Sequence, residues 1–368
     1  MRVFILNQYK PPDPSPTAKL VGDLAAALRG EGHQVVMIDS GQDYRVRAKS
    51  RYSRAGRELK ALSRLLCRGL LAGRADVVIS TSSPPAILLV ATALCALKRA
   101  KSVHWALDLY PELALALGGA VPAPIRSILH TATGSCYRAT TRTICLDADM
   151  RDHLKRRYGI DTEIIRPWLL HGLDRTGPGR LAYPSRDGFT WLYSGNLGQA
   201  HDWETAMAAQ RILEDRGCPV TLAFQGGGAS WEPARRRAEQ LKLARVEWRP
   251  YAPEDRLTDV LLQAHAMLVT QKPCTRGLLW PSKLGLLMCL PRPLIFIGPE
   301  NGAIAREIRV CGYGECFPPG AAGPLAGYVQ NLYEQWPPGE KPSLRPGWTF
   351  EQAWKAWRRV LQEVSGRL

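Results

Sequence analysis

The sequence predicts an α/β protein of two domains, each built on an open parallel sheet covered by helices. The chain has 368 residues, which is more than one ordinary hydrophobic core accommodates. Strand-like runs alternate with helical runs along nearly all of it. One polar stretch rich in glycine and proline, residues 171–188, interrupts this alternation and predicts a linker between the domains.

The first predicted domain covers residues 1–170. Its strands are expected at Val3–Leu6, Gln34–Ile38, Asp76–Ser80, Ser102–Leu107, Thr143–Leu146 and Glu163–Ile165. Its helices are expected at Thr17–Arg29, Gly56–Leu71, Pro85–Lys98 and Ile125–Ala139. The apolar run from Pro84 to Leu97 is too short to span a bilayer, so it predicts a buried helix.

The second predicted domain covers residues 189–345. Its strands are expected at Phe189–Tyr193, Val220–Phe224, Val246–Arg249, Ala266–Val269 and Leu294–Ile297. Its helices are expected at Asp202–Arg216, Trp231–Lys242, Asp255–Gln263, Ser282–Leu290 and Ala303–Arg309. A last helix, Thr349–Val364, follows a proline-rich break. Ligands of such sheets bind beyond the carboxyl ends of the strands, so the residues there carry the functional information.

Composition narrows the partners and the compartment. Nine cysteines are scattered singly without a C-x-x-C pair, which argues against a zinc site or a disulfide framework and favours a reducing compartment. Met1-Arg2 leads directly into a short apolar strand, so no signal peptide is expected. The net charge of +16 indicates either an anionic partner (nucleic acid, membrane or phosphorylated substrate) or a solvated basic surface.

Two loops of the second domain suit a phosphate. Ser194-Gly195-Asn196 lies between a predicted strand and a helix, where backbone N–H groups and the helix dipole attract anions. Pro281 and Ser282 suit a helix start, and Lys283 then opposes the dipole of its own helix unless an anion lies between them. An ordinary turn and a solvated lysine are the alternatives. A third loop, Phe224–Gly228, predicts a tight turn close to a ligand or a neighbouring loop.

Several segments, in order along nearly the whole chain, resemble the WbuB/WcaI-like branch of the retaining GT4 glycosyltransferases. They are Met1–Pro14, Asp108–Leu113, Arg166-Pro167-Trp168, Tyr193–Asp202, Pro281–Leu284 and Arg292–Gly298. The resemblance implies the GT-B fold, with two Rossmann-like domains, an interdomain cleft and a C-terminal helix, 349–368, that crosses back to the N-terminal domain. It implies a metal-independent hexosyltransferase that needs no cofactor besides its substrates.

The implied reaction moves a sugar from a nucleotide-diphosphate sugar, with a UDP-sugar as the expected donor, to a lipid-linked or saccharide acceptor. The implied pathway is the synthesis of bacterial surface polysaccharides or glycolipids. By the resemblance, the donor site comprises Ser194, Gly195, Asn196, Arg249, Tyr251, Arg276, Gly277, Ser282, Lys283 and Leu284. Arg249 and Tyr251 are expected near the nucleobase, and Ser194–Asn196 and Ser282-Lys283 at the diphosphate.

One position departs from the family pattern. The branch often has a glutamate directly before the glycine that aligns with Gly277, and Arg276 stands there. Because a guanidinium cannot accept a hydrogen bond from a sugar hydroxyl, three explanations stay open. The donor sugar carries a carboxylate, the alignment shifts, or the chain is a catalytically impaired, nucleotide-sugar-binding subunit.

Three residues of the first domain are candidates for catalysis or acceptor binding. Asp108 follows a strand and suits an acceptor-orienting group or a base. His104 lies at the end of the same strand, where a satisfied core histidine is the alternative. Asp13 follows the first strand within a proline loop, where it either positions the acceptor or only shapes the loop.

A basic stretch from Arg45 to Arg74 contains leucines at helical spacing, namely Leu59, Leu62, Leu66 and Leu70. It predicts a helix lying on an anionic membrane, or a helix whose leucines pack on the sheet. With the resemblance, it predicts a cytoplasmic protein held peripherally at the inner face of the cytoplasmic membrane. A sugar-nucleotide epimerase of the same fold and a basic nucleic-acid-binding protein are the rivals. No nucleic-acid motif accompanies the charge, so no nucleic acid is expected.

Overall fold

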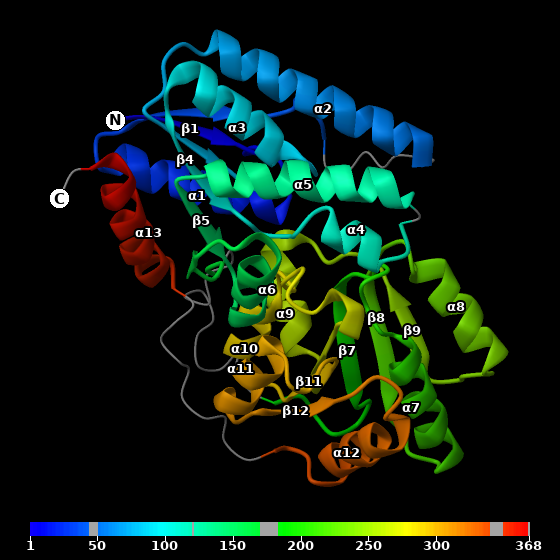
Figure 1. Ribbon diagram of the computed structural model, residues 1–368. Helices are drawn as coiled ribbons and strands as arrows, with labels where there is room; N and C mark the ends of the chain where they lie inside the picture. The colour runs from blue at the N-terminus through cyan, green and yellow to red at the C-terminus, as the bar shows by residue number, and fades with distance from the viewer. Residues whose placement is uncertain (44–50, 120, 170–182, 339–348, 367–368) are drawn as a thin grey trace. The chain divides into compact units, whose positions relative to one another are not determined.

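The computed structural model describes residues 1–43, 51–119, 121–169, 183–338 and 349–366, which form two compact units (Figure 1). Unit 1 comprises Met1–Leu170, Gly277–Ser282 and Gly347–Leu368, and unit 2 comprises His171–Arg276 and Lys283–Pro346. Most of the predicted linker, 171–182, lies outside the described residues, as do Arg45, Arg47 and Lys49 of the basic stretch. Residues 277–282, which the sequence places in the second domain, pack within unit 1.

Unit 1 is built on a six-stranded parallel sheet with the strand order β2-β1-β3-β4-β5-β6. The strands are β1 (Arg2–Leu6), β2 (Gln34–Ile38), β3 (Val77–Ser80), β4 (Lys101–Trp105), β5 (Arg142–Cys145) and β6 (Thr162–Ile164). Leu6 pairs with both Ile38 and Ser80, so the residues that follow these strands gather at one edge. The interior strands β1 and β3 are buried almost throughout, as expected for a sheet covered on both faces.

Seven helices of the described chain belong to unit 1: α1 (Pro16–Gly30), α2 (Arg51–Leu71), α3 (Ile87–Lys98), α4 (Glu112–Ala116), α5 (Ala123–Ala139), α6 (Ala148–Tyr158) and α13 (Phe350–Ser365). Ser15 accepts a hydrogen bond from the Ala18 amide and caps α1, and Asp147 caps α6 through the Met150 amide. None of the helices described has the length and apolar character needed to cross a bilayer.

The C-terminal helix α13 packs on the sheet of unit 1, as the resemblance implies. Trp357 of α13 is fully buried, and its ring meets Trp105 of β4 edge to face at a centroid distance of 5.1 Å. Trp105 stacks on Trp168, whose indole N–H donates to Asp23 of α1. These aromatic contacts explain why a segment so distant in sequence from β4 returns to the first domain.

Unit 2 contains a second six-stranded parallel sheet, with the order β12-β11-β10-β7-β8-β9. The strands are β7 (Thr190–Asn196), β8 (Thr221–Gly227), β9 (Val246–Arg249), β10 (Ala266–Thr270), β11 (Leu294–Ile297) and β12 (Gly314–Phe317). The α-helices are α7 (Glu204–Asp215), α8 (Trp231–Gln240), α9 (Leu257–Leu262), α10 (Leu284–Cys289), α11 (Ala303–Cys311) and α12 (Ala322–Glu334). The strand β12 and the helix α12 are absent from the elements expected by sequence.

The basic helix α2 matches neither prediction in full: its leucines do not all pack on the sheet, and its arginines do not all face outward. Leu62 and Leu66 pack against the core of unit 1, but Leu59 is 67% exposed and Leu70 is 44% exposed. Several of its arginines bond to the loop after β2 instead of facing solvent freely. Arg64 donates to the Ser40 carbonyl, and Arg68 donates to Asp39 at 3.1 Å. The leucines are therefore divided between core and surface.

Candidate functional site

Lys283, directly before α10, contacts the end of β7 within unit 2. The Lys283 ammonium donates a hydrogen bond to the Ser194 hydroxyl at 3.2 Å, and that hydroxyl donates to the Gln225 side-chain carbonyl at 3.1 Å. Ser194 pairs with Gln225 in the β7–β8 register, and Gln225 pairs with Arg249. The structure therefore brings Lys283 to Ser194, at the carboxyl ends of the adjacent strands β7 and β8.

Lys283 carries a charge that the protein only weakly satisfies. Burial lowers the pKa of its ammonium from 10.5 to about 8. Among the residues that the structure describes, no carboxylate pairs with it, and its hydrogen-bond partner is a neutral hydroxyl. A desolvated cation with such an environment favours the binding of an anion, because an anion restores the lost solvation.

The helix that follows Lys283 begins later than predicted. α10 covers Leu284–Cys289, and Lys283 occupies the N-cap position instead of the first turn. Pro281 and Ser282 precede the helix, and Ser282 is exposed at the end of the segment that belongs to unit 1. Leu284 is fully buried and anchors α10 in unit 2. The position of Lys283 therefore comes from its contact with β7 and not from a long helix.

The glycines of the β8 loop serve close backbone approach. Gly226 has φ +130°, and a Cβ there would lie 2.0 Å from the Gly195 carbonyl oxygen. Gly228 has φ +142°, and a Cβ there would lie 2.2 Å from the Leu197 carbonyl oxygen. Residues with side chains rarely adopt these dihedrals, so the glycines let the two loops lie against each other. The predicted approach to a neighbouring loop is confirmed.

The two residues expected near a nucleobase, Tyr251 and Arg249, differ in their contacts near the ends of β7 and β8. Tyr251 is 49% exposed, and a Cβ built on Gly226 or Gly227 would lie 3.2 Å from its ring. Arg249 ends β9, where both its Nε and Nη2 donate to Glu247. Tyr251 therefore offers a ring at the loop, whereas the guanidinium of Arg249 is engaged by a carboxylate.

Arg276 and Gly277 separate at the boundary of the units. The Arg276 guanidinium donates to the Asn301 carbonyl at 3.0 Å, just before α11. Gly277 has φ +69°, and a Cβ there would lie 2.8 Å from the backbone of Asp149 in unit 1. Within unit 1, the Leu109 amide donates to the Leu278 carbonyl, and Asp108 forms an antiparallel bridge with Leu279.

Asp108 lies in a pocket of unit 1 lined by Ser82, Ala86, Ile87, Leu88, Leu89, His104, Asp108, Tyr110, Thr133, Cys136 and Tyr137. The Ser82 hydroxyl accepts from the Leu107 and Asp108 amides at 2.9 and 2.8 Å and fixes the backbone after β4. Burial raises the pKa of the Asp108 carboxyl to about 6, and no donor to this carboxylate occurs among the described residues. An unpaired carboxylate of this pKa suits a proton acceptor near neutral pH.

His104 and Asp13 have structural partners. His104 is buried, its Nδ1 lies 2.9 Å from the Ser80 hydroxyl, and burial lowers its pKa to about 3. It is therefore neutral at physiological pH, with its ring edge-on to Tyr137 in the lining of the same pocket. The Asp13 carboxylate accepts from the Ser15 amide at 2.9 Å, within the loop that leads into α1.

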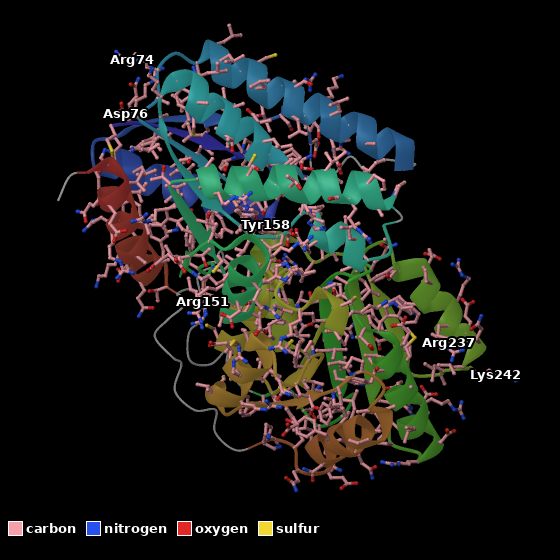
Figure 2. All side chains as sticks on the ribbon, viewed as in Figure 1. Arg74, Asp76, Arg151, Tyr158, Arg237 and Lys242 are labelled. Carbon is pink, nitrogen blue, oxygen red and sulfur yellow. The ribbon has the colours of Figure 1, made fainter. Side chains whose placement is uncertain are left out.

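A buried polar cluster between α4, α5 and α6 was not predicted from the sequence. The Tyr158 hydroxyl donates to Glu112, and His130 Nδ1 lies 3.5 Å from the same carboxylate (Figure 2, Tyr158). Tyr158 also stacks on Tyr137, which lines the pocket at Asp108. Tyr158 and Glu112 are 46 residues apart, so no local motif indicates their contact. The cluster holds α4 against α5 and α6.

Comparison with known proteins gives a family match over part of the chain and a likeness of fold. The family model of Glycosyltransferase Family 4 matches residues 17–168. The comparison with curated protein sequences gives no match.

The fold is similar to that of sucrose-phosphate synthase from Thermosynechococcus elongatus, with a TM-score of 0.72, 14% identity and all of both chains covered. It is also similar to the lipopolysaccharide outer core galactosyltransferase WaaB, with a TM-score of 0.62, 14% identity and 99% of each chain covered. Anabaena HepE in complex with UDP-glucose gives a TM-score of 0.63 at 12% identity, over 99% of this chain and 100% of that one. The family match covers residues 17–168, which is less than half of the chain, and the likeness to the solved structures shows that the chain has the GT-B fold.

Proposed function

We propose that the chain transfers a hexose from a UDP-sugar, with retention of anomeric configuration and without a metal ion, to a lipid-linked or saccharide acceptor. The setting would be the synthesis of a bacterial surface polysaccharide or glycolipid at the inner face of the cytoplasmic membrane. The observation that carries the proposal is the contact of Lys283 with Ser194 at the end of β7. Two of the similar structures are HepE in complex with UDP-glucose and the lipopolysaccharide outer core galactosyltransferase WaaB.

The diphosphate of the donor would bind at Lys283 and Ser194. The ammonium lacks a carboxylate partner among the described residues, and the Ser194 hydroxyl is available to turn toward a phosphate oxygen. When the bond between the anomeric carbon and the diphosphate breaks, negative charge grows on the leaving phosphate. A preorganised cation in a poorly solvated position stabilises that charge more than water does. Tyr251 would offer its exposed ring to the base.

The acceptor would bind at the pocket of Asp108 in unit 1. Its attacking hydroxyl must lose a proton as the new glycosidic bond forms. The unpaired Asp108 carboxylate, with a pKa of about 6, is ionised at neutral pH and suits orienting that hydroxyl or taking its proton. His104 would act as a neutral lining group, because burial lowers its pKa to about 3 and its Nδ1 lies against the Ser80 hydroxyl. Asp13 would act on the acceptor only through the shape of its loop.

The test is a thermal unfolding screen with UDP, GDP and a panel of UDP-sugars and GDP-sugars, followed by an assay for UDP release with and without acceptor. We expect UDP and a UDP-sugar to raise the unfolding temperature, and the acceptor to be required for UDP release. Stabilisation by no nucleotide would overturn the proposal. Binding without release of UDP would support the impaired subunit, and conversion of the UDP-sugar without acceptor would support an epimerase.

A further inference from the structure

Large aliphatic side chains gather on the surface of three neighbouring helices of unit 1. Ten large hydrophobic residues are exposed within the described chain, and eight of them lie on α2, α3 and α5: Leu59, Leu70, Leu71, Leu89, Leu97, Ile125, Ile128 and Leu129. α3 contacts both α2 and α5, and the three helices lie side by side over the first sheet (Figure 1). We call this surface the three-helix face. Gathered aliphatic side chains mark an interaction site, whereas single ones do not.

The helix α3 is apolar on its outer side as well as on its inner side. Its exposed positions within the helix follow helical spacing and carry no charge: Leu89, Ala93, Ala96 and Leu97. Its inner side packs on the sheet through Ile87, Val90, Ala91 and Leu94. A helix that is apolar all round normally lies inside a core or in an apolar medium. The sequence predicted a buried helix here, and the structure leaves its outer side uncovered within unit 1.

The flanking helices extend the apolar surface. Leu71 is 86% exposed at the end of α2, and Leu97 is 68% exposed near the end of α3. On α5, residues 123–129 are all exposed, and they include Ile128 at 66%. These residues do not pack on the sheet, so their apolar character serves no core of unit 1.

Charge around the face selects among apolar partners. The three helices contain nine lysines and arginines and one acid, Glu58. Lys60 on α2, Arg99 after α3 and Arg126 on α5 are exposed. Long cationic side chains beside aliphatic ones suit the boundary between lipid headgroups and acyl chains, where the stems lie in the apolar layer and the charges meet phosphates.

The face is continuous with the pocket of Asp108. Leu89 is 43% exposed at the start of α3 and also lines that pocket. Thr133 lines it from α5, one helical turn after the exposed Leu129. A molecule that rests on the three-helix face can therefore reach the unpaired carboxylate without leaving unit 1.

We propose that the three-helix face docks into the surface of an anionic bilayer, with its aliphatic side chains in the acyl boundary and Lys60, Arg99 and Arg126 at the level of the phosphates. The inference rests on the proposed function in one respect, since a lipid-linked acceptor would explain why the pocket at Asp108 opens on this face. It extends the expected membrane contact from the basic stretch to α3 and α5, and it assigns no lipid contact to Arg64 and Arg68, which are engaged by the loop after β2.

The experiment is flotation of the full chain with vesicles of phosphatidylcholine alone and of phosphatidylcholine mixed with phosphatidylglycerol. The apolar variant combines L71S, L97S and I128S, one substitution on each helix. The control is V310S on α11 of unit 2, where Val310 is 49% exposed. We expect wild type and V310S to float with the anionic vesicles, and the apolar variant to bind at least about tenfold more weakly. Its unfolding temperature should not fall, because the three side chains are exposed.

A charge variant combines K60A, R99N and R126A, with R237A on α8 as its control (Figure 2, Arg237). Asparagine is chosen at Arg99 because φ is +55° there. We expect the charge variant to lose the preference for anionic vesicles and R237A to keep it. Equal binding by wild type and the apolar variant would overturn the proposal. So would sedimentation that shows wild type as a dimer and the apolar variant as a monomer. Protection by UDP, measured without lipid, reports separately on the proposed function.

Discussion

Lys283, beside the end of β7 in unit 2, and Asp108, in the pocket of unit 1, carry opposite charges in similarly buried positions. Each charge has lost water without gaining an ionic partner among the described residues. Burial moves both pKa values toward neutrality, down to about 8 for Lys283 and up to about 6 for Asp108. The difference lies in what would satisfy them, because the lysine requires an anion and the carboxylate requires a donor or a proton. Under the proposed function, the diphosphate would therefore bind in unit 2 and the acceptor hydroxyl in unit 1.

The largest expected effect tests the carboxylate. We expect D108N to lower kcat about 100- to 1000-fold, because the amide cannot take a proton from the acceptor, while UDP affinity stays unchanged. Steady-state kinetics and calorimetry with UDP measure the two effects. The matched control is D147N: the pKa of Asp147 is also raised to about 6 by burial, but its carboxylate caps α6. A full kcat in D108N would remove Asp108 from the reaction.

The same variant separates function from folding. Because burial raises the pKa of Asp108, its stabilising contribution is complete below pH 3.8 and is lost as the pH rises through about 6. At pH 8, D108N should therefore be more stable than wild type by about 3 kcal/mol in the free energy of unfolding, and should unfold at a higher temperature. A thermal melt checks this, and a large destabilisation would indicate that the carboxylate supports the fold.

The next effect concerns the cation. We expect K283M to weaken UDP binding about 30- to 100-fold, because the diphosphate loses its contact with the desolvated ammonium beside Ser194. The folded state disfavours the charged lysine, so stability from this group is complete above pH 10.5 and is lost as the pH falls through about 8. The variant should consequently be at least as stable as wild type at pH 7. R237M on α8 serves as the surface control, and unchanged UDP affinity in K283M would contradict the assignment.

The two pKa values together predict a bell-shaped pH dependence of kcat/KM. The reaction needs Asp108 ionised and Lys283 charged, so activity should fall about tenfold per pH unit below pH 6 and above pH 8. K283R should move the alkaline limb to higher pH and leave the acidic limb in place. A profile that is flat from pH 5 to pH 9 would mean that neither group takes part.

The smallest effect sharpens the role of the serine. S194A removes the hydroxyl that accepts from Lys283, and we expect a 3- to 10-fold loss of UDP affinity, about 1 kcal/mol. It should also shift the alkaline limb toward lower pH, because the ammonium loses a partner. S230A provides a buried serine of unit 2 as control. Equal UDP affinities in S194A and S230A would show that Ser194 only packs.

The sequence anticipated features that depend on local order along the chain. By the resemblance, Ser194 and Lys283 were expected at one diphosphate, and the structure has the two side chains in contact. The predicted start of α10 at Ser282 was wrong. The helix begins at Leu284 and has only six residues, and Lys283 contacts β7 instead. The strand β12 was missed because Gly314 and Glu315 interrupt its apolar pattern, and its pairing with β11 requires the close approach that Gly314 permits.

Features that depend on distant contacts were not accessible from the sequence. The neutral state of His104 results from its burial in the folded chain, and its partner Ser80 lies opposite it only through the parallel register of β3 and β4. Arg64 and Arg68 appeared free in the sequence because their partners lie on the loop after β2. The sequence of an apolar helix such as α3 does not reveal whether its outer side is covered by other elements or exposed. Leu97 therefore suggested a core residue, although it is exposed.

The central claim is that a nucleotide diphosphate binds to the desolvated ammonium of Lys283, and proton linkage tests it most directly. UDP binding is measured by calorimetry at pH 8.5 in two buffers of different ionisation enthalpy. Because the pKa of Lys283 is about 8 in the free protein, most of its ammonium is neutral at that pH, and a bound diphosphate should restore the proton. The account predicts uptake of more than half a proton by wild type and none by K283M. Equal proton uptake in the two proteins, or none in wild type, would contradict it.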